Sequence, residues 1–138
     1  MFSEWLFRKG KKIGFEDIKH IINSPNEQYI MINTLPTNLQ NCLIKKTVPS
    51  HNEEKIINQL LENYEMKKVH IVIYGKNSVD ETVDHKYKQL YDLGFSQVYL
   101  YSGGLFEWLL LQDIYGADEF PTHGKIMDIL ELKPSKLL

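Results

Sequence analysis

One stretch of the sequence, HIVIYGKNSVDETVDHKYKQL at residues 70–90, has the layout of an anion-binding site. An apolar run leads through a glycine turn into a helical pattern, and the first N–H groups of such a helix can bind an anion. The turn, however, has Gly75 where a nucleophile could stand, and Asp80 and Glu81 where a cation could stand. These two acids favour the helix dipole but repel an anion, so the sequence argues against anion binding here.

The residues of this turn have a structural and a functional interpretation. In the structural one, Gly75 supplies a positive φ, Asn77 tolerates the left-handed region, and Ser78 caps the helix with Glu81 at capping-box spacing. In the functional one, residues 75–78 form a polar pocket for a small neutral or cationic ligand. The structural interpretation is the simpler one.

Cys42 is the one cysteine of the chain, which excludes an internal disulfide and a multi-cysteine zinc site. It could act in sulfur chemistry if Lys45 or Lys46 lowered its pKa, or it could be a small buried hydrophobic residue. A single cysteine fits a reducing, intracellular compartment, so we expect a cytoplasmic protein.

The five histidines, at positions 20, 51, 70, 85 and 123, lie on different predicted elements without helical pair spacing. The sequence therefore supports no metal site, and we expect no cofactor. The chain has 138 residues and a net charge of -2, which predicts one domain and argues against nucleic acid as a partner. No apolar run approaches the ~20 residues of a membrane span. The cluster Arg8, Lys9, Lys11 and Lys12 is interpreted as solvated charge.

Four segments have the apolar, β-branched character of strands: residues 29–34, 42–49, 69–74 and 97–101. The segment 69–74 is the strongest and should be central in a sheet, 29–34 should be buried on both faces, and 42–49 is the weakest.

Helical spacing of apolar residues predicts helices between these strands. The first precedes Pro25, and the second opens at a capping box of Ser50 and Glu53. The third ends at a left-handed Gly94, and the fourth is LFEWLLLQDIYG. A last helical piece is expected at 126–132. The second helix should place one apolar face inward, made of Ile56, Ile57, Leu60, Leu61 and Tyr64.

This alternation of strands and helices predicts an α/β fold with a mostly parallel sheet covered by helices on both faces. Ligand sites in such sheets lie beyond the carboxyl ends of the strands. The loops after Asn33, Tyr74 and Tyr101 should therefore meet.

The order of these pieces resembles the rhodanese-like domain. A central strand ending in Tyr is followed by a tight loop, a helix closing at LGF, a strand VYLY and then SGGLFEW. Upstream, YIMINT and NCLIKKTVP stand where the family has an Asp-x-Arg motif and Gly-His-Ile-x-Gly-Ala with a proline. The resemblance covers residues 13–111 and implies a three-layer sandwich that serves either sulfur transfer or protein interaction.

Catalytic members carry a cysteine directly after the central strand, in a loop of roughly Cys-x-x-Gly-x-Arg. Carried over by position, the resemblance implies that the chemically active residues are replaced here. The replacements are Gly75 for the cysteine, Ser78 for the loop glycine, Asp80 for the arginine, Asn33 and Leu35 for the upstream aspartate and arginine, and Cys42 at or beside the histidine. The degenerate loop comprises Gly75, Lys76, Asn77, Ser78, Val79, Asp80 and Glu81. Glycine has no side chain with which to form a covalent intermediate, so the standard reaction is excluded at this position.

The segment GGLFEWLLLQDIY is apolar nearly all round. Either the chain from Ala117 onward folds back over it, or a partner chain covers it. The N-terminal residues Phe2, Trp5, Leu6 and Phe7 offer a second aromatic surface, and a homodimer through these surfaces is one alternative. Coverage of each surface by the other within one chain is favoured.

We therefore expect a single rhodanese-like domain over residues 1–138, with a core of about 13–111 and a C-terminal extension of 112–138. The favoured function is a catalytically inactive module that binds an unknown protein or regulates it. Its expected binding residues are Gly75, Asn77, Ser78, Gly103, Gly104 and Trp108. The alternative is an enzyme of altered chemistry that uses Cys42 or the polar 75–81 loop.

Overall fold

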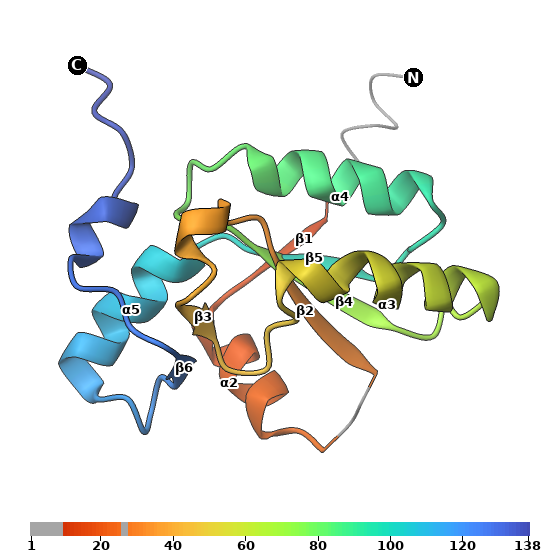
Figure 1. Cartoon of the computed structure of the whole chain (residues 1–138), viewed down its shortest axis with the longest axis horizontal. Coiled ribbons are helices and arrows are strands. Elements are labelled where there is room, and N and C mark those ends of the chain that lie inside the picture. Colours follow the sequence, from red (N-terminus) through yellow and green to blue (C-terminus); the bar gives the residue numbers. More distant parts are fainter. Residues whose placement is uncertain (1–9, 26–27) are drawn as a thin grey trace.

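A four-stranded parallel sheet forms the centre of the structure, a computed structural model that describes residues 10–25 and 28–138 (Figure 1). The order of strands across the sheet is β1-β5-β4-β2, and every neighbouring pair is parallel. The strands are β1 (Lys11–Ile13), β5 (Val98–Tyr101), β4 (His70–Tyr74) and β2 (Tyr29–Asn33).

The central strand β4 is the apolar run that the sequence singles out, and its predicted position is confirmed. Ile71, Val72 and Ile73 are fully buried, because β5 and β2 flank the strand and helices cover both faces. Burial on both faces is the reason why this strand lacks alternating polar residues.

Helices cover both faces of the sheet, which gives the predicted three layers (Figure 1). On one face, α3 (Ser50–Glu62) and α4 (Thr82–Asp92) pack on Ile71 and Ile73. On the other face, α2 (Phe15–Asn23) and α5 (Gly104–Tyr115) pack on Val72 and Tyr74. None of the described helices has the length and apolarity to cross a bilayer.

The C-terminal tail, residues 117–138, folds back over α5. Phe120 packs edge-on against Trp108, with ring centroids 5.0 Å apart, and Leu132 is fully buried. The tail also contains β6 (Thr122–His123), which pairs antiparallel with β3 (Leu43–Ile44), and the 3-10 turn η2 (Ile129–Leu132). Intramolecular coverage of α5 is therefore confirmed, while the aromatic residues at positions 2–7 lie outside the described residues.

Three predicted elements are corrected. The strand expected at 42–49 shrinks to β3, outside the main sheet, with Thr47 forming an isolated parallel bridge to Met31. The helix expected at 126–132 is only the short turn η2. The strand β1 was not expected, because Lys11 and Lys12 are exposed at the sheet edge and have the composition of a solvated cluster. Arg8 and Lys9 of that cluster lie outside the described residues.

The helix ends also differ from expectation in part. The capping box of Ser50 and Glu53 is wrong: Pro49 is the N-cap of α3, and Glu53 instead pairs with Lys86 of α4 at 2.6 Å. Tyr64 does not lie on the inward face, because α3 ends at Glu62 and Tyr64 is 84% exposed with a φ of 54°. Gly94 does adopt the predicted left-handed conformation, at φ 107°.

Between the second strand and α3 lies the short 3-10 turn η1 (Thr37–Leu39). Just before it, Asn33 and Leu35 occupy the positions that the family resemblance gives to aspartate and arginine. The Asn33 Oδ1 accepts hydrogen bonds from the Leu35 N–H at 3.0 Å and from Gln40 Nε2 at 2.7 Å. Both residues are buried, so they stabilise the turn and the core instead of presenting charge.

Candidate functional site

The loops at the carboxyl ends of β2, β4 and β5 meet, as predicted. The Thr34 N–H donates to the Tyr74 carbonyl at 3.0 Å, and the Leu105 N–H donates to the Gly75 carbonyl at 2.9 Å. Backbone hydrogen bonds therefore join all three loops around the 75–81 loop. This is the place where parallel α/β sheets bind their ligands.

Gly104 brings the start of α5 against the backbone of the 75–81 loop. Its φ is +68°, and an added Cβ would lie 2.8 Å from both the Asn77 nitrogen and the Gly75 oxygen. The Phe106 N–H donates to the Lys76 carbonyl at 2.8 Å in the same contact. Only glycine fits here, because both the conformation and the space exclude a side chain.

Gly75 is required for space and not for a positive φ. It is absent from the positive-φ residues of the described chain, so that prediction is wrong. An added Cβ would collide with Asp80 Oδ2 and lie 2.8 Å from Val83 Cγ2 and 2.9 Å from Thr34 Oγ1. The volume where a catalytic side chain would begin is thus filled by other residues of this chain.

Asp80 supplies the atom that lies nearest to this volume. Its Oδ2 accepts a hydrogen bond from the Lys76 N–H at 2.9 Å, and its Oδ1 accepts from the Thr82 N–H at 3.0 Å and from the Thr82 hydroxyl at 2.6 Å. The Thr82 and Thr34 hydroxyl oxygens are 2.8 Å apart. An internal carboxylate therefore takes backbone and hydroxyl contacts that an anionic ligand would otherwise use.

The capping box predicted for Ser78 and Glu81 does not form. Glu81 is the N-cap of α4 with helical backbone and makes no side-chain cap bond. Ser78 is exposed, and Val79 beside it is 62% exposed at the tip of the loop. Asp80 has the capping role that was expected of Ser78, because its carboxylate accepts hydrogen bonds from the Lys76 and Thr82 amides on either side of the turn.

Asn77 ties the loop to the C-terminal tail. Its Oδ1 accepts from the Val79 N–H at 3.0 Å, and its Nδ2 donates to the Leu132 carbonyl at 2.8 Å. Asn77 is 9% exposed and does not have the predicted left-handed conformation. Both polar atoms of the Asn77 side chain are therefore hydrogen-bonded within the chain.

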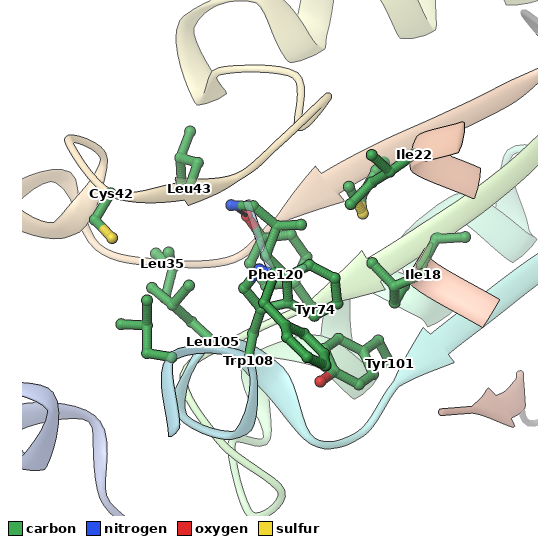
Figure 2. Close-up of a cluster of buried hydrophobic side chains, with 14 of the residues drawn as sticks. Ile18, Ile22, Leu35, Cys42, Leu43, Tyr74, Tyr101, Leu105, Trp108 and Phe120 are labelled. Atoms are coloured by element: carbon green, nitrogen blue, oxygen red, sulfur yellow. Dashed lines mark hydrogen bonds between the residues drawn. The ribbon is translucent and has the colours of Figure 1, made fainter. Parts of the chain in front are cut away.

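Two further residues expected to bind a partner, Gly103 and Trp108, differ in exposure: Gly103 is half-buried and Trp108 lies in the core. Gly103 is half-buried next to the Glu107 carboxylate, which would lie 2.5 Å from a Cβ at position 103. Trp108 is fully buried and donates its Nε1–H to the Pro121 carbonyl at 3.2 Å (Figure 2). Trp108 thus belongs to the core and not to the rim of the site.

Two tyrosines at strand ends carry buried hydroxyls that sequence reasoning missed. The Tyr74 hydroxyl accepts from the Ile44 N–H at 3.1 Å and lies 2.8 Å from Thr47 Oγ1. The Tyr101 hydroxyl donates to Glu107 Oε1 at 2.7 Å. Burial raises the pKa of each tyrosine well above its ordinary value, and the Glu107 carboxylate adds to the effect at Tyr101. Both hydroxyls therefore remain neutral hydrogen-bonding groups.

Cys42 is fully buried, with its Sγ 3.9 Å from the Gly124 carbonyl of the tail (Figure 2). Burial raises the pKa of its thiol, which is the opposite of the direction expected from nearby lysines. The Lys46 Nζ instead binds the Ser24 carbonyl at 2.9 Å. Cys42 has the environment of a structural residue and not of an activated nucleophile.

Cys42 should accordingly resist alkylation in the folded chain. We expect iodoacetamide to modify it at least tenfold more slowly in buffer than in urea, because the thiol is both buried and protonated. Because burial raises the folded pKa of the thiol, stability is at its full value below about pH 8.5, the ordinary pKa, and falls as pH rises through the folded pKa. Intact mass against time over a pH series measures the reaction, and equal rates in buffer and urea would contradict the burial.

Potential metal ligands do not cluster in the part of the chain that the structure describes. Within residues 10–25 and 28–138, no group of three or more His, Cys, Asp or Glu side chains is arranged to bind a metal ion. The site therefore consists of backbone amides, hydroxyls and one internal carboxylate.

Comparison with known proteins finds a family that matches this chain. A family model described as "Rhodanese-like domain" matches residues 14–111, well over half of the chain. No curated protein matches the sequence.

Solved structures agree with this family at low sequence identity. The Alr3790 protein from Anabaena sp. is 20% identical with a TM-score of 0.57, and the match covers 86% of each chain. The single-domain sulfurtransferase RDL2 from Saccharomyces cerevisiae is 14% identical with a TM-score of 0.54, over 81% of this chain and 96% of RDL2. EanB is 16% identical with a TM-score of 0.60, over 85% of this chain but only 28% of EanB. At these identities the likeness concerns the fold alone.

Proposed function

We infer that this chain, which belongs to the rhodanese-like domain family, acts as a protein-binding or regulatory module that has lost sulfur transfer. The family includes sulfurtransferases, of which RDL2 is one. The inference rests on what occupies the site, because the fold is shared by proteins of different activity.

A single observation carries the proposal: the space for a nucleophilic side chain at position 75 is filled by the Asp80 carboxylate. Position 75 is glycine, and a Cβ there would collide with Asp80 Oδ2. Sulfur transfer through a persulfide needs a thiolate that attacks the outer sulfur of the donor, and no group at this position can do so. The carboxylate also places negative charge where an anionic donor such as thiosulfate would bind.

The alternative enzyme of altered chemistry has less support. Cys42 is buried with a raised pKa, so its thiol is neither accessible nor ionised. In the polar 75–81 loop, Asp80, Thr82 and Thr34 hydrogen-bond to one another and Asn77 binds the tail. These internal contacts stabilise the loop and leave Ser78 and Val79 as its exposed tip.

We propose another protein as the partner in preference to a second copy of this chain. A homodimer through aromatic surfaces would need those of α5 to be exposed. Trp108 is instead fully buried, and Tyr115 is the aromatic residue of α5 with large exposure, at 64%. The covered face of α5 therefore offers a second copy little aromatic area.

A cyanide–thiosulfate assay tests the loss of activity. We expect the native chain and Cys42→Ser to give the same thiocyanate signal as buffer, while a thiosulfate-active sulfurtransferase assayed in parallel gives a clear one. Thiocyanate production that disappears in Cys42→Ser would overturn the proposal and favour the alternative enzyme. Production that survives in Cys42→Ser would overturn it as well and would point to the 75–81 loop.

A further inference from the structure

One segment of the C-terminal tail, residues 126–132, lies on the domain with a regular pattern of burial. Ile126 and Ile129 are half-buried and pack against the hydrophobic core to which α5 contributes, and Leu132 is fully buried. These residues are spaced by three. Ile129 and Leu132 lie within η2, and Ile126 lies in irregular chain before it, yet all three pack against the core. Met127 and Leu130 face outward and are 103% and 58% exposed.

The 126–132 segment packs against α5 and the 75–81 loop (Figure 1). Leu132 joins the same core cluster as Leu105 and Leu109 of α5. At the same point, Asn77 Nδ2 holds the Leu132 carbonyl at 2.8 Å. The segment therefore contacts the rest of the domain through three of its apolar side chains and through the backbone oxygen of Leu132.

The segment has few polar ties to the rest of the protein. Its other described hydrogen bonds are internal: Asp128 accepts from the Leu130 and Glu131 amides, and the Leu130 carbonyl accepts from the Lys133 N–H. Upstream, the tail is firmly attached through Gly124, whose Cβ position would overlap the Asn41 carbonyl. Among the described residues, Asn77 thus makes the one hydrogen bond that connects 125–133 to the domain.

We propose that residues 126–132 occupy, within their own chain, a peptide-binding groove between α5 and the 75–81 loop. The occupant that fits this groove in trans is a protein segment with apolar residues at three positions spaced by three. A hydrogen bond to a backbone carbonyl does not depend on sequence, so the apolar spacing sets the specificity. This inference rests on the proposed function and names the surface and the kind of partner.

Competition with the chain's own segment explains how binding would be regulated. A tethered segment acts at an effective concentration on the order of millimolar, so a free peptide binds the native chain weakly. Weakening the internal segment should raise the apparent affinity of the free peptide by the same factor. A partner that binds would at the same time release Met127 and Leu130 from their present positions.

The test uses the full chain and a fluorescein-labelled peptide of residues 124–134, GKIMDILELKP. In anisotropy titrations we expect the peptide to bind Leu132→Ser at least tenfold more tightly than the native chain. Met127→Ser is the matched control, because it changes an exposed residue of the same segment and should bind like the native chain. Adding Asn77→Ala to Leu132→Ser should weaken binding by about two- to tenfold, the worth of one hydrogen bond.

Circular dichroism establishes that each variant is folded, and Ile129→Ser replaces Leu132→Ser if that variant is not. Amide exchange of the native chain is a measurement that needs no variant: residues 126–133 should exchange faster than β4. No binding to a folded variant, equal binding of a peptide carrying Leu132→Ser, or exchange of this segment only by global unfolding would each overturn the groove. A native dimer formed by exchanging tails would also overturn it, because the occupant would then be a second copy.

The peptide test and the cyanide assay fail independently. A silent cyanide assay with no peptide binding removes the groove and leaves the inactive module in place. Thiocyanate production removes the inactive module whatever the peptide does.

Discussion

Replacing Gly75 by cysteine is expected to lower the free energy of unfolding by about 1–3 kcal/mol and to leave the protein without sulfur transfer. The new Cβ would collide with Asp80 Oδ2 and approach Val83 Cγ2 to 2.8 Å. Val83 is buried in the first turn of α4 and is stiff at χ1, so it cannot move aside freely. The adjacent Asp80 carboxylate would also keep the new thiol protonated. Urea denaturation and the cyanide–thiosulfate assay measure the two effects.

The matched control for this variant is Gly14→Cys. Gly14 has a negative φ, and a Cβ there would meet nothing within 4 Å, so its stability should change by less than about 0.5 kcal/mol. The double variant Gly75→Cys/Asp80→Ala should regain part of the stability, with a coupling of about 0.5–3 kcal/mol, and should have a more acidic thiol. If Gly75→Cys is as stable as Gly14→Cys, or transfers sulfur by itself, then the site is not filled as described.

Trp108→Ala is expected to cost about 3–5 kcal/mol, which is a large share of the ~5–15 kcal/mol of a typical domain. Trp108 is fully buried and packs edge-on against Tyr101 and Phe120, with ring centroids 6.3 Å and 5.0 Å away. Its removal would leave a cavity between α5 and the tail and would remove one of the two donors to the Pro121 carbonyl, which also accepts from the Lys45 N–H at 3.1 Å. Thermal and urea unfolding followed by tryptophan-independent circular dichroism measure the loss.

Two further variants separate the contributions of Trp108. Trp108→Phe keeps most of the aromatic packing and loses the hydrogen bond to Pro121, so we expect a cost of about 1–3 kcal/mol. Ile114→Ala on the same helix removes a side chain that is 70% exposed and should change stability by less than about 0.5 kcal/mol. A Trp108→Ala variant as stable as Ile114→Ala would return Trp108 to the surface role that the sequence suggested.

The elements that were predicted well are those whose sequence pattern is dictated by burial. The apolar run ending at Tyr74 could only be a central strand, and the apolar helix after Gly104 needed a cover that the tail provides. β1 escaped prediction because three residues with two exposed lysines carry no burial pattern. Its place in the sheet comes from pairing with β5, which is a tertiary contact and not a local preference.

The sequence identifies the 75–81 loop and its acids but not their geometry. Its prediction that Asp80 and Glu81 disfavour an anion remains a prediction, and the capping side chain is Asp80 where the pattern favours Ser78. Either side chain can bond a free amide at a helix start, and the choice depends on the path of the loop. Gly104, which is distant in the sequence, lies in close contact with the backbone of the loop and so restricts that path. The burial of Cys42 agrees with the structural alternative that the sequence offers, whereas its contact with Gly124 of the tail is a long-range contact that no local pattern predicts.

The pairing of β1 with β5 also has a consequence for how the chain folds. Lys11 lies opposite Tyr99, so β1, which just precedes the matched region 14–111, pairs with a strand near the end of that region. Closing so long a loop is entropically costly, and contacts this distant in sequence slow folding. During synthesis, β1 must wait until β5 has left the ribosome, while β2 and β4 can already pair. The edge of the sheet is therefore expected to close late, after its centre has formed.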